Sequence, residues 1–520
     1  MRRAVPALLV AAVLVCFLPV LRNDFVAWDD DLNFTENPSY RGLGPSQLAW
    51  MFTTVHGGHY QPLSWVTLGL DYTLWGMNPV GYHLTNLCLH AANAALVYGV
   101  LLALVGREQA LAAAVGALFF AVHPLRVESV AWASERRDVL SGFFWLLAVL
   151  AYLRAQRDAR PRWLALSLGG FVASLLSKAW GITLPVVLLI ADAHPLGRLT
   201  DARERRRALV EKAPYVLLAL AAAAVAFAAV RPIGATRTLA EHDLLARTAQ
   251  AAYGLCFYLW KTVVPRHLSP LYLLDLRLDP GRPRYLAAML AVAGITAALV
   301  LARRRWPWAL AAWAAYVVIV SPVLGFVQTG PQVAADRYTY LACLPWAAVV
   351  AAAARRRAVA LTALVPIAVL GVLTFRQAGV WRDSSTLWEY VVRIDPTNYV
   401  AYTNRGYTRQ ARGDRDGALA DYDTAIRIHP GYALAWYNRG TERHARGDLA
   451  GALADLTMSI RLNPRDPRAW NNRGWVREKQ GDLNGAAADY AEALRVAPPD
   501  FPGRAFIEKN LAAVRALGAR

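Results

Sequence analysis

Three short polar stretches hold the residue types that a reaction on a phosphorylated substrate would need. "WDDD" contains Asp29 and Asp30, "ERRD" contains Arg136 and Arg137, and "ADRY" contains Arg337. A carboxylate can act as a general base that takes the proton of an acceptor hydroxyl. Arginines bind phosphate oxygens through paired hydrogen bonds and stabilise the charge that develops on a leaving phosphate. This set suits transfer from a phosphate carrier, and a lipid-linked sugar phosphate presents its phosphate at a membrane surface.

The same carboxylates have simpler explanations. Asp30 or Asp31 could cap a following helix, which leaves open which of Asp29, Asp30 and Asp31 is the base. A proline separates His123 from Glu128, so these two side chains are not expected on one helix face, and structural hydrogen bonding explains His123 equally well. Hard divalent cations prefer carboxylate oxygens, but no spacing here demands a metal. We therefore assign no metal ligand and leave a divalent metal open.

The composition indicates the elements that must position these residues. The 520-residue chain is 56% hydrophobic, and apolar stretches of about 20 residues, the length of a membrane-spanning helix, recur through its first three quarters. The net charge is +19, but the arginines cluster between apolar stretches, as in cytoplasmic loops of membrane proteins, so nucleic-acid binding is not expected. The four cysteines form no CxxC pair, which argues against a zinc site or a disulfide framework.

We expect an all-α protein in which a polytopic membrane bundle of about 11 spans precedes a helical solenoid. Arg2 and Arg3 place the amino terminus in the cytoplasm. We interpret 247–264 as an interfacial or re-entrant helix, because a crossing there would put later arginine clusters outside. The extracytoplasmic loops are then 22–81, 123–138, 231–283 and 326–337. The expected spans are 4–21, 82–104, 109–124, 139–154, 162–177, 181–196, 213–230, 284–302, 306–326, 337–354 and 358–377.

The carboxyl-terminal part repeats every 34 residues. The repeated features are a proline (Pro396, Pro430, Pro464, Pro498), an "NRG" tripeptide and a "GD" dipeptide. This period and pattern are typical of tetratricopeptide repeats, which have two helices per repeat. We predict a membrane domain over 1–380, a linker helix over 381–394, and three repeats with a capping helix over 395–520. The asparagines of "NRG" either bind a peptide in the concave groove or orient helices within a repeat; they are Asn404, Asn438 and Asn472.

The chain also resembles a known family. "FVAWDDDLNFTENP", "HPLRVESVAWASERRDVLSGFFWLLAVLAY", "SKAWGITLPVVLLIAD" and "VQTGPQVAADRYTYL" are similar to segments of the transmembrane and tetratricopeptide-repeat family, and the similarity extends over the whole chain in order. Animal members of that family are protein O-mannosyltransferases. The resemblance implies the GT-C glycosyltransferase fold and a polyprenyl-phosphate sugar as donor on the non-cytoplasmic side. The third aspartate of "WDDD" and the small number of repeats depart from the family pattern.

The resemblance implies a role for each candidate residue. Asp29 would be the catalytic base, and Asp30 would assist it. The donor phosphate would be held by Arg136 and Arg337, with Lys178 at the outer tip of a helical hairpin as a further candidate. The remaining residues of the family motifs and outer loops would shape the pocket; they are His59, Tyr60, His123, Glu128, Asp138 and Tyr338.

The expected function is therefore that of a glycosyltransferase in a bacterial inner membrane. It would transfer a sugar, of which mannose is one candidate, from a polyprenyl-phosphate donor to a protein hydroxyl, and periplasmic repeats would recruit the acceptor. Two alternatives remain open: transfer to an envelope glycan or lipid, and a non-catalytic membrane scaffold that binds proteins through the repeats. A transporter would need polar residues at mid-membrane, and the expected spans are nearly free of charge.

Overall fold

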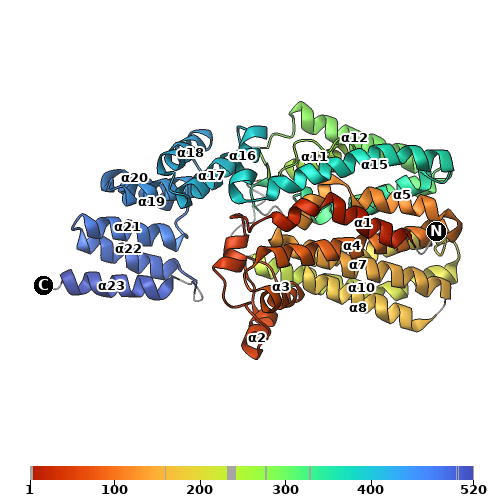
Figure 1. Cartoon of the computed structure of the whole chain (residues 1–520), viewed down its shortest axis with the longest axis horizontal. Coiled ribbons are helices and arrows are strands. Elements are labelled where there is room, and N and C mark those ends of the chain that lie inside the picture. The colour runs from red at the N-terminus through yellow and green to blue at the C-terminus, as the bar shows by residue number, and fades with distance from the viewer. Residues whose placement is uncertain are drawn as a thin grey trace. The chain divides into compact units, whose positions relative to one another are not determined.

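The computed structural model describes residues 4–158, 160–230, 242–275, 278–326, 330–498, 501 and 503–518. It divides into two compact units, Met1–Asp383 and Ser384–Arg520, which we call unit 1 and unit 2. Helices make up most of both units (Figure 1). In the described part of unit 1, a two-stranded antiparallel sheet joins β1 (Tyr272–Leu273) to β2 (Gln332–Ala334). Parts of the expected outer loops, 231–241, 276–277 and 327–329, lie outside the described residues.

Many helices of unit 1 begin with proline, which suits the first turn because a backbone N–H there has no partner within the helix. Its α-helices are α1 (Val5–Cys16), α2 (Pro45–Thr53), α3 (Pro62–Trp75), α4 (Pro79–Val105), α5 (Ala110–Ala121), α6 (Val127–Ala131), α7 (Arg136–Asp158), α8 (Pro161–Ser177), α9 (Leu184–Ala193), α10 (Ala202–Val230), α11 (Leu244–Val263), α12 (Pro283–Leu301), α13 (Pro307–Val320), α14 (Leu344–Ala353) and α15 (Arg357–Ala378).

Each expected span contains a helix, but not every helix is long enough to cross a membrane. Among the described residues, five helices have the length and hydropathy of a span: α4, α10, α12, and the segments Ala133–Asp158 and Arg357–Trp381, which include α7 and α15. A sixth span results if Arg107–Ala121 and Pro124–Ala131, which are bent by 56° at their junction, cross together. The predicted number of eleven is therefore not reached by long helices.

Short apolar helices account for much of the difference. Four of the expected spans, 4–21, 181–196, 306–326 and 337–354, contain only shorter apolar helices. These helices are Val5–Cys16, Ala179–Ala193, Pro307–Val323 and Leu344–Ala353. The α9 helix ends just before His194-Pro195, since a residue that precedes proline is disfavoured in helical conformation. An apolar stretch in the sequence therefore measures the hydrophobic length of a segment but not the length of its helix.

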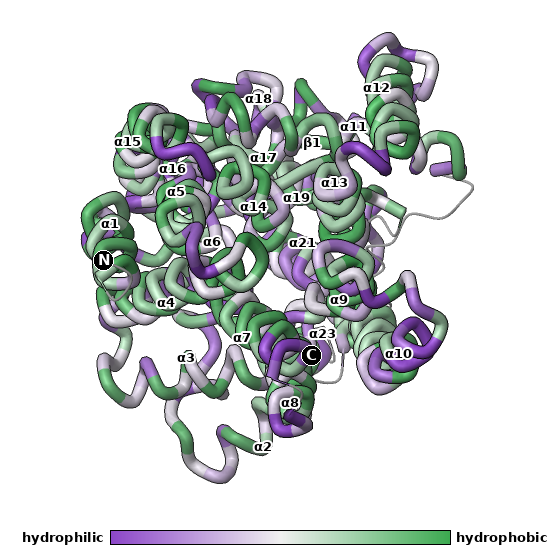
Figure 2. The backbone as a smooth tube through the Cα atoms, turned by 90° about the vertical axis from the view of Figure 1, so that its right-hand side faces the viewer, coloured by the Kyte–Doolittle hydropathy of each residue, from purple (hydrophilic) through white to green (hydrophobic). Residues whose placement is uncertain are grey.

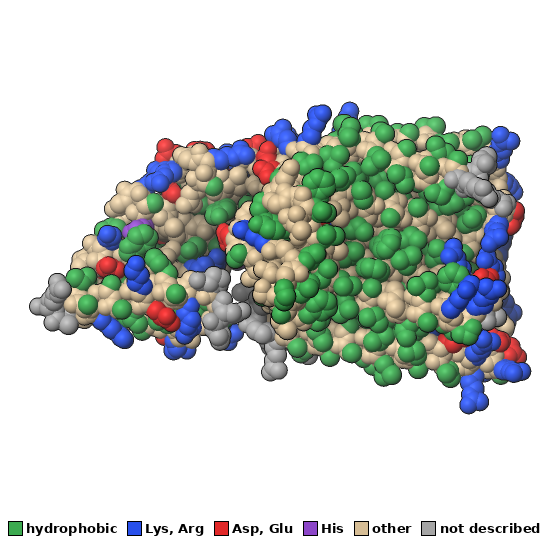
Figure 3. Space-filling model, turned by 60° about the horizontal axis from the view of Figure 1, so that its bottom comes forward, with side chains coloured by type: hydrophobic (Ala, Val, Ile, Leu, Met, Phe, Trp, Pro, Cys, Tyr) green, Lys and Arg blue, Asp and Glu red, His purple; other side chains and the backbone are tan. Residues whose placement is uncertain are grey.

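Exposed apolar side chains cover the flank of unit 1, and lysines and arginines gather at one end (Figure 3). Leu217, Leu220, Leu290 and Val365 are more than half exposed although they lie on long apolar helices. Large exposed apolar surfaces mark contact with a membrane or a partner, and helices of this length suit a membrane. Figure 2, viewed along the bundle, shows hydrophilic segments at the starts of α8 and α10.

Unit 2 begins with α16 (Ser384–Ile394), which covers most of the predicted linker helix. Three helix pairs follow, and a final helix packs on the last pair; they are α17 (Tyr399–Ala411), α18 (Arg415–Ile428), α19 (Ala433–Ala445), α20 (Leu449–Leu462), α21 (Pro467–Lys479), α22 (Leu483–Val496) and α23 (Arg504–Gly518).

The "GD" dipeptide makes the turn within each pair. Its glycine has a φ of 83–85°, a left-handed conformation that glycine adopts without strain, and its aspartate accepts a hydrogen bond from a backbone N–H in the first turn of the next helix.

A buried ion pair joins the two helices of each repeat. In the second repeat, the guanidinium of Arg439 donates two hydrogen bonds to the carboxylate of Asp455, at 2.8 and 2.7 Å. The same paired bonds join Arg405 to Asp421 and Arg473 to Asp489. The arginine of "NRG" therefore has a structural role within its own repeat.

Candidate active site

Asp29 and Asp30 are neighbours in sequence but have different surroundings. The carboxylate of Asp30 is fully buried and accepts hydrogen bonds from the backbone N–H of Val26 (3.0 Å) and from both the N–H (3.0 Å) and the hydroxyl (2.5 Å) of Ser134. Burial raises the pKa of Asp30 to about 7. Asp30 thus joins the first outer loop to the second, and its oxygens are occupied by these bonds.

Asp29 is half-buried, and charged side chains from two other segments surround it. Burial raises the pKa of Asp29 to about 6, against the opposing effect of the positive charges of Arg137 and Arg337, while the negative charge of Glu135 raises it further. A carboxylate whose pKa lies near neutrality can accept a proton efficiently from a substrate hydroxyl. The pKa of Asp30 is raised as well, but the carboxylate oxygens of Asp30 accept the hydrogen bonds described above, whereas Asp29 lies among the charges of Arg137 and Arg337.

Glu135 lies at the centre of a group of charged side chains that we call the charged cluster. The buried carboxylate of Glu135 accepts a hydrogen bond from Arg137 at 2.6 Å and one from Lys178 at 2.9 Å, and it lies 3.5 Å from Nε of Arg337. The three cations come from the first turn of α7, the end of α8, and the 3-10 helix Asp336–Thr339. Segments that are distant in sequence therefore converge here, as their motifs predict.

Arg337 is held from several sides. Its backbone N–H donates to Oε2 of Glu128 at 2.7 Å, and its guanidinium donates to the other carboxylate oxygen of Glu128. The guanidinium also lies over the rings of Trp132 and Tyr338, with its carbon 5.4 and 4.9 Å from the ring centroids. These contacts fix the plane of the guanidinium, which favours paired hydrogen bonds to a phosphate.

Lys178 completes the cluster. Its ammonium group lies 2.5 Å from Oδ1 of Asp138 and 5.1 Å from the ring centroid of Trp180, and the ring of Trp180 packs edge-on against Tyr338. Asp138 also accepts a hydrogen bond from Ser129 at 3.0 Å. Asp138 and Tyr338, two of the predicted pocket residues, therefore lie in the charged cluster.

The solvent-facing part of the cluster is positive. The side chains of Lys178, Arg137 and Arg337 are 18%, 10% and 10% exposed, whereas those of Glu135 and Glu128 are 0% and 2% exposed. The carboxylates thus lie behind the cations and orient them. The cations are therefore the more accessible charges of the cluster, although Arg137 and Arg337 are largely buried, and Asp29 lies beside them at a half-buried position.

Arg136 does not join the cluster. Its side chain is completely buried, where it forms an ion pair with Asp71 at 2.5 Å, donates to the carbonyl of Tyr82 at 2.9 Å and contacts Asn86. Arg136 and Arg137 are consecutive residues at the start of α7, and consecutive side chains project about 100° apart around a helix. Of these two neighbouring candidates for phosphate binding, Arg137 lies in the charged cluster and Arg136 lies in the protein interior.

The other predicted pocket residues lie at the margin of the charged cluster or in the protein interior. His123 is buried; its Nδ1 accepts from the N–H of Leu125 at 3.2 Å, and its Nε2 lies 2.9 Å from the carbonyl oxygen of Thr262, so its role is structural. His59 is exposed and lies near enough to Arg137 and Lys178 for their positive charges to act on its imidazole. Tyr60 donates its hydroxyl hydrogen to the carbonyl of Phe52 at 3.1 Å.

Sequence reasoning missed Glu135 and Trp132. Glu135 was present in the quoted "ERRD", where a carboxylate directly precedes two arginines and is followed by an aspartate. This mixture of charges in a short segment between two apolar stretches could have indicated a buried ion-pair network. Trp132 had no comparable signal, because tryptophan is also common in the aromatic belts of membrane proteins.

Two of the three predicted groove asparagines make contacts within the solenoid. Asn404 donates to the carbonyl of Val400 on its own helix at 3.0 Å, and Asn472 donates to the hydroxyl of Tyr437 in the preceding repeat at 3.1 Å. Asn438 is half-buried on α19. These bonds support the alternative in which the "NRG" asparagines orient helices. Throughout the described residues, no group of three His, Cys, Asp or Glu side chains is arranged to hold a metal ion.

Comparisons with known proteins bear on both units. A tetratricopeptide-repeat family model matches residues 403–464 and 441–501. The human protein O-mannosyl-transferase TMTC4 is 28% identical over 215 residues, which are 36% of this chain and 29% of that protein. Human TMTC1 is 33% identical over 229 residues, 40% of this chain and 25% of its own length. Drosophila melanogaster Tmtc1 is 37% identical over 142 residues, 27% of this chain and 16% of that protein.

The similarity to solved structures is confined to a small part of the chain. The first tetratricopeptide domain of Spaghetti (RPAP3), bound to an HSP90 peptide, matches 24% of this chain and 97% of its own length at 21% identity, with a TM-score of 0.23. The chain spans less than a third of the length of the human relatives it matches. Sequence similarity to TMTC1 and TMTC4, together with the tetratricopeptide match, confirms that this chain resembles the transmembrane and tetratricopeptide-repeat family.

Proposed function

We propose that this protein is a membrane glycosyltransferase of the GT-C type that transfers a sugar from a polyprenyl-phosphate carrier to an acceptor hydroxyl. The observation that carries the proposal is the position of Asp29 beside the cations Arg137 and Arg337, which share the carboxylate of Glu135 with Lys178. The name of the relatives, protein O-mannosyl-transferase, supports sugar transfer and makes mannose the first sugar to test.

The proposed reaction is a displacement at the anomeric carbon of the sugar. Asp29 accepts the proton of the acceptor hydroxyl while the acceptor oxygen bonds to that carbon. The bond between the anomeric carbon and the phosphate oxygen breaks, and the electron pair stays with the phosphate. Arg137 and Arg337 stabilise the negative charge that develops there, and Lys178 adds a third positive charge. Glu128 and Glu135 keep the guanidinium groups oriented before the substrate binds.

The proposed setting is a bacterial inner membrane with the charged cluster on the extracytoplasmic side. The arginine-rich turns after α7 and before α10 lie at the opposite ends of these helices from the cluster, which the positive-inside rule would place in the cytoplasm. The shorter apolar helices would complete about eleven spans together with the long ones, and unit 2 would then face the periplasm.

The proposed acceptor is a protein that unit 2 recruits. Tetratricopeptide repeats form solenoids that present extended binding surfaces, and the relatives act on proteins according to their names. Transfer to an envelope glycan or lipid is the alternative. Incubation of the full-length protein with a mannosyl donor and either periplasmic protein or envelope lipid separates the two by which fraction becomes labelled.

The central test replaces Asp29 by asparagine in the full chain. Asp29→Asn keeps the size of the side chain but removes its ability to accept a proton. We expect sugar transfer from polyprenyl-phosphate mannose to fall by about 100-fold or more, with unchanged membrane expression. Asp31→Asn is the matched control, since Asp31 belongs to the same aspartate run. Full transfer activity of Asp29→Asn, or a selective loss in Asp31→Asn, would contradict the assignment of the base.

A further inference from the structure

A cavity lies at the end of unit 1 opposite the charged cluster. It has a volume of 1240 Å³ and is lined by residues from α4, α7, α8 and the segments before α5 and around the start of α10. Arg137 lies in the first turn of α7, whereas Arg154 and Arg157, which line this cavity, lie near its last turn. At a rise of 1.5 Å per residue, about 25–30 Å of helix separates the cavity from the charged cluster, close to the thickness of the hydrocarbon core. The cavity is therefore distinct from the candidate active site.

The cavity has a positive mouth and an apolar wall. Its charged lining comprises five arginines and three carboxylates, which leaves two positive charges in excess. Its apolar lining comes from α4 and α7, one to two turns further toward the middle of the bundle. The charged residues are Arg107, Glu108, Arg154, Arg157, Asp158, Arg198, Glu204 and Arg207, and the apolar ones include Leu102, Leu150 and Leu153.

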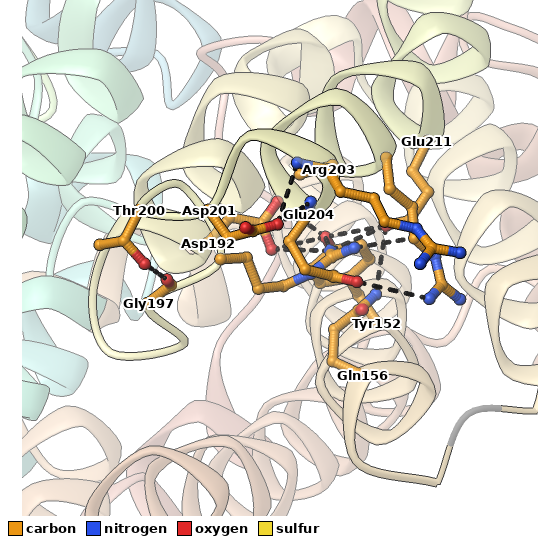
Figure 4. Close-up of polar contacts among 12 residues, drawn as sticks. Tyr152, Gln156, Asp192, Gly197, Thr200, Asp201, Arg203, Glu204 and Glu211 are labelled. Carbon is orange, nitrogen blue, oxygen red and sulfur yellow. Dashed lines mark hydrogen bonds and ion pairs between the residues drawn. The ribbon is translucent and has the colours of Figure 1, made fainter.

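A buried network fixes one side of the mouth (Figure 4). The guanidinium of Arg198 donates to the hydroxyl of Tyr152 (2.8 Å), to Asp192 (3.1 Å) and to Glu211 (2.8 Å). The ammonium of Lys212 lies 2.5 Å from the other oxygen of Asp192. The two cations and two carboxylates of this network balance each other. With Arg198 balanced in this way, four arginines and three carboxylates of the lining remain, so one positive charge is in excess, and it belongs to the exposed arginines at the mouth.

One donor at the mouth has no acceptor. The indole Nε1 of Trp163, at the start of α8, is buried and forms no hydrogen bond within the described part of the chain. The guanidinium of Arg154 lies over the ring of Trp163, 5.2 Å from its centroid, and that of Arg162 lies 5.4 Å from it. A buried donor without a partner costs about 1–3 kcal/mol. A negatively charged oxygen bound beside Arg154 would accept a hydrogen bond from the indole N–H of Trp163.

We propose that this cavity binds the phosphate headgroup of an anionic membrane lipid. Arg107 and Arg154 bind the phosphate, Trp163 donates a hydrogen bond to the headgroup, and the apolar wall formed by α4 and α7 contacts the first part of an acyl chain. A free phosphate ion has the same charge but no apolar part, so the wall favours a lipid as the source of the phosphate. Clusters of arginines at the membrane boundary attract anionic lipids of the facing leaflet. This binding does not depend on the transfer reaction.

The test measures lipid binding by the full-length protein in an uncharged detergent. Phosphatidylglycerol, phosphatidylcholine and inorganic phosphate are titrated separately, and bound lipid is counted by native mass spectrometry. The double variant Arg107→Gln/Arg154→Gln removes two exposed side chains of the mouth, so folding should be unaffected. Its control is Arg304→Gln/Arg356→Gln, which removes the same charge from exposed turns that do not line the cavity.

We expect phosphatidylglycerol to bind about tenfold more weakly to the cavity variant than to the wild type or the control. Trp163→Phe should weaken binding less, because it removes a single donor. An equal loss in both double variants would show non-specific attraction to surface charge and overturn the proposal. Equal affinity for phosphatidylcholine would also overturn it. Competition by inorganic phosphate at the same concentration as the lipid would show a phosphate site that does not select lipids.

Discussion

Asp30 should be essential for the stability of unit 1. Asp30→Ala removes the acceptor for two buried backbone N–H groups, those of Val26 and Ser134. Each buried donor left without a partner costs about 1–3 kcal/mol, so the free energy of unfolding should fall by about 2–6 kcal/mol. The Ser134 hydroxyl still accepts a hydrogen bond from Nδ2 of Asn33 at 2.9 Å, but it too loses the acceptor for its own hydrogen, so this figure is a lower estimate. Asp30→Asn should have a smaller effect, since the amide oxygen can still accept.

The measurement is thermal unfolding of the purified protein in detergent, followed by circular dichroism. The control is Asp29→Ala, which changes the same residue type one position earlier at a half-buried site. We expect Asp30→Ala to lower the melting temperature by several degrees and Asp29→Ala to lower it by a degree or less. Equal melting temperatures for the two variants would refute the structural role of Asp30 and reopen its role as an assisting catalytic carboxylate.

Three further predictions concern the active site and the repeats. A pKa of about 6 for Asp29 means that the base is protonated in acid, so transfer should decline as the pH falls through about 6, and residual transfer by Asp29→Asn should show no such step. Arg137→Gln should reduce kcat/KM for the donor about 100-fold, measured in the transfer assay, because a charged contact to the leaving phosphate is lost. Asp455→Ala removes the acceptor of the paired bonds from Arg439 and of one bond from Arg443, while Arg439 keeps its contact with the exposed Asp423, so unit 2 should lose about 1–3 kcal/mol of stability in urea unfolding.

The sequence predicted where the helices lie and which segments form the candidate site. Apolar length and the 34-residue period are properties of single segments, so they can be recognised without tertiary structure. The motifs around Asp29, Arg137 and Arg337 do converge. Each of them lies next to helix ends that share one end of unit 1. The helix breaks near His123 and His194 were harder to predict, because they depend on how a proline is accommodated by its neighbours.

The role of each residue within a motif could not be predicted. Asp29 and Asp30 are chemically identical neighbours, and so are Arg136 and Arg137. Whether a side chain faces the cluster or the interior depends on backbone rotation at that position, which tertiary packing decides. In both pairs one member faces the charged cluster, and the other forms buried bonds that hold the outer segments together.

The ion pair inside each repeat of unit 2 bears on how this protein family varies in length. Arg439 and Asp455 lie 16 residues apart within one 34-residue period, so neither partner belongs to an adjacent repeat. A duplication or deletion of a whole period in the gene therefore leaves every remaining pair of this kind intact, whereas pairs between repeats, such as that of Arg439 with Asp423, must form anew. Evolution can lengthen or shorten such an array one period at a time, and only the surface between the new neighbours has to adapt.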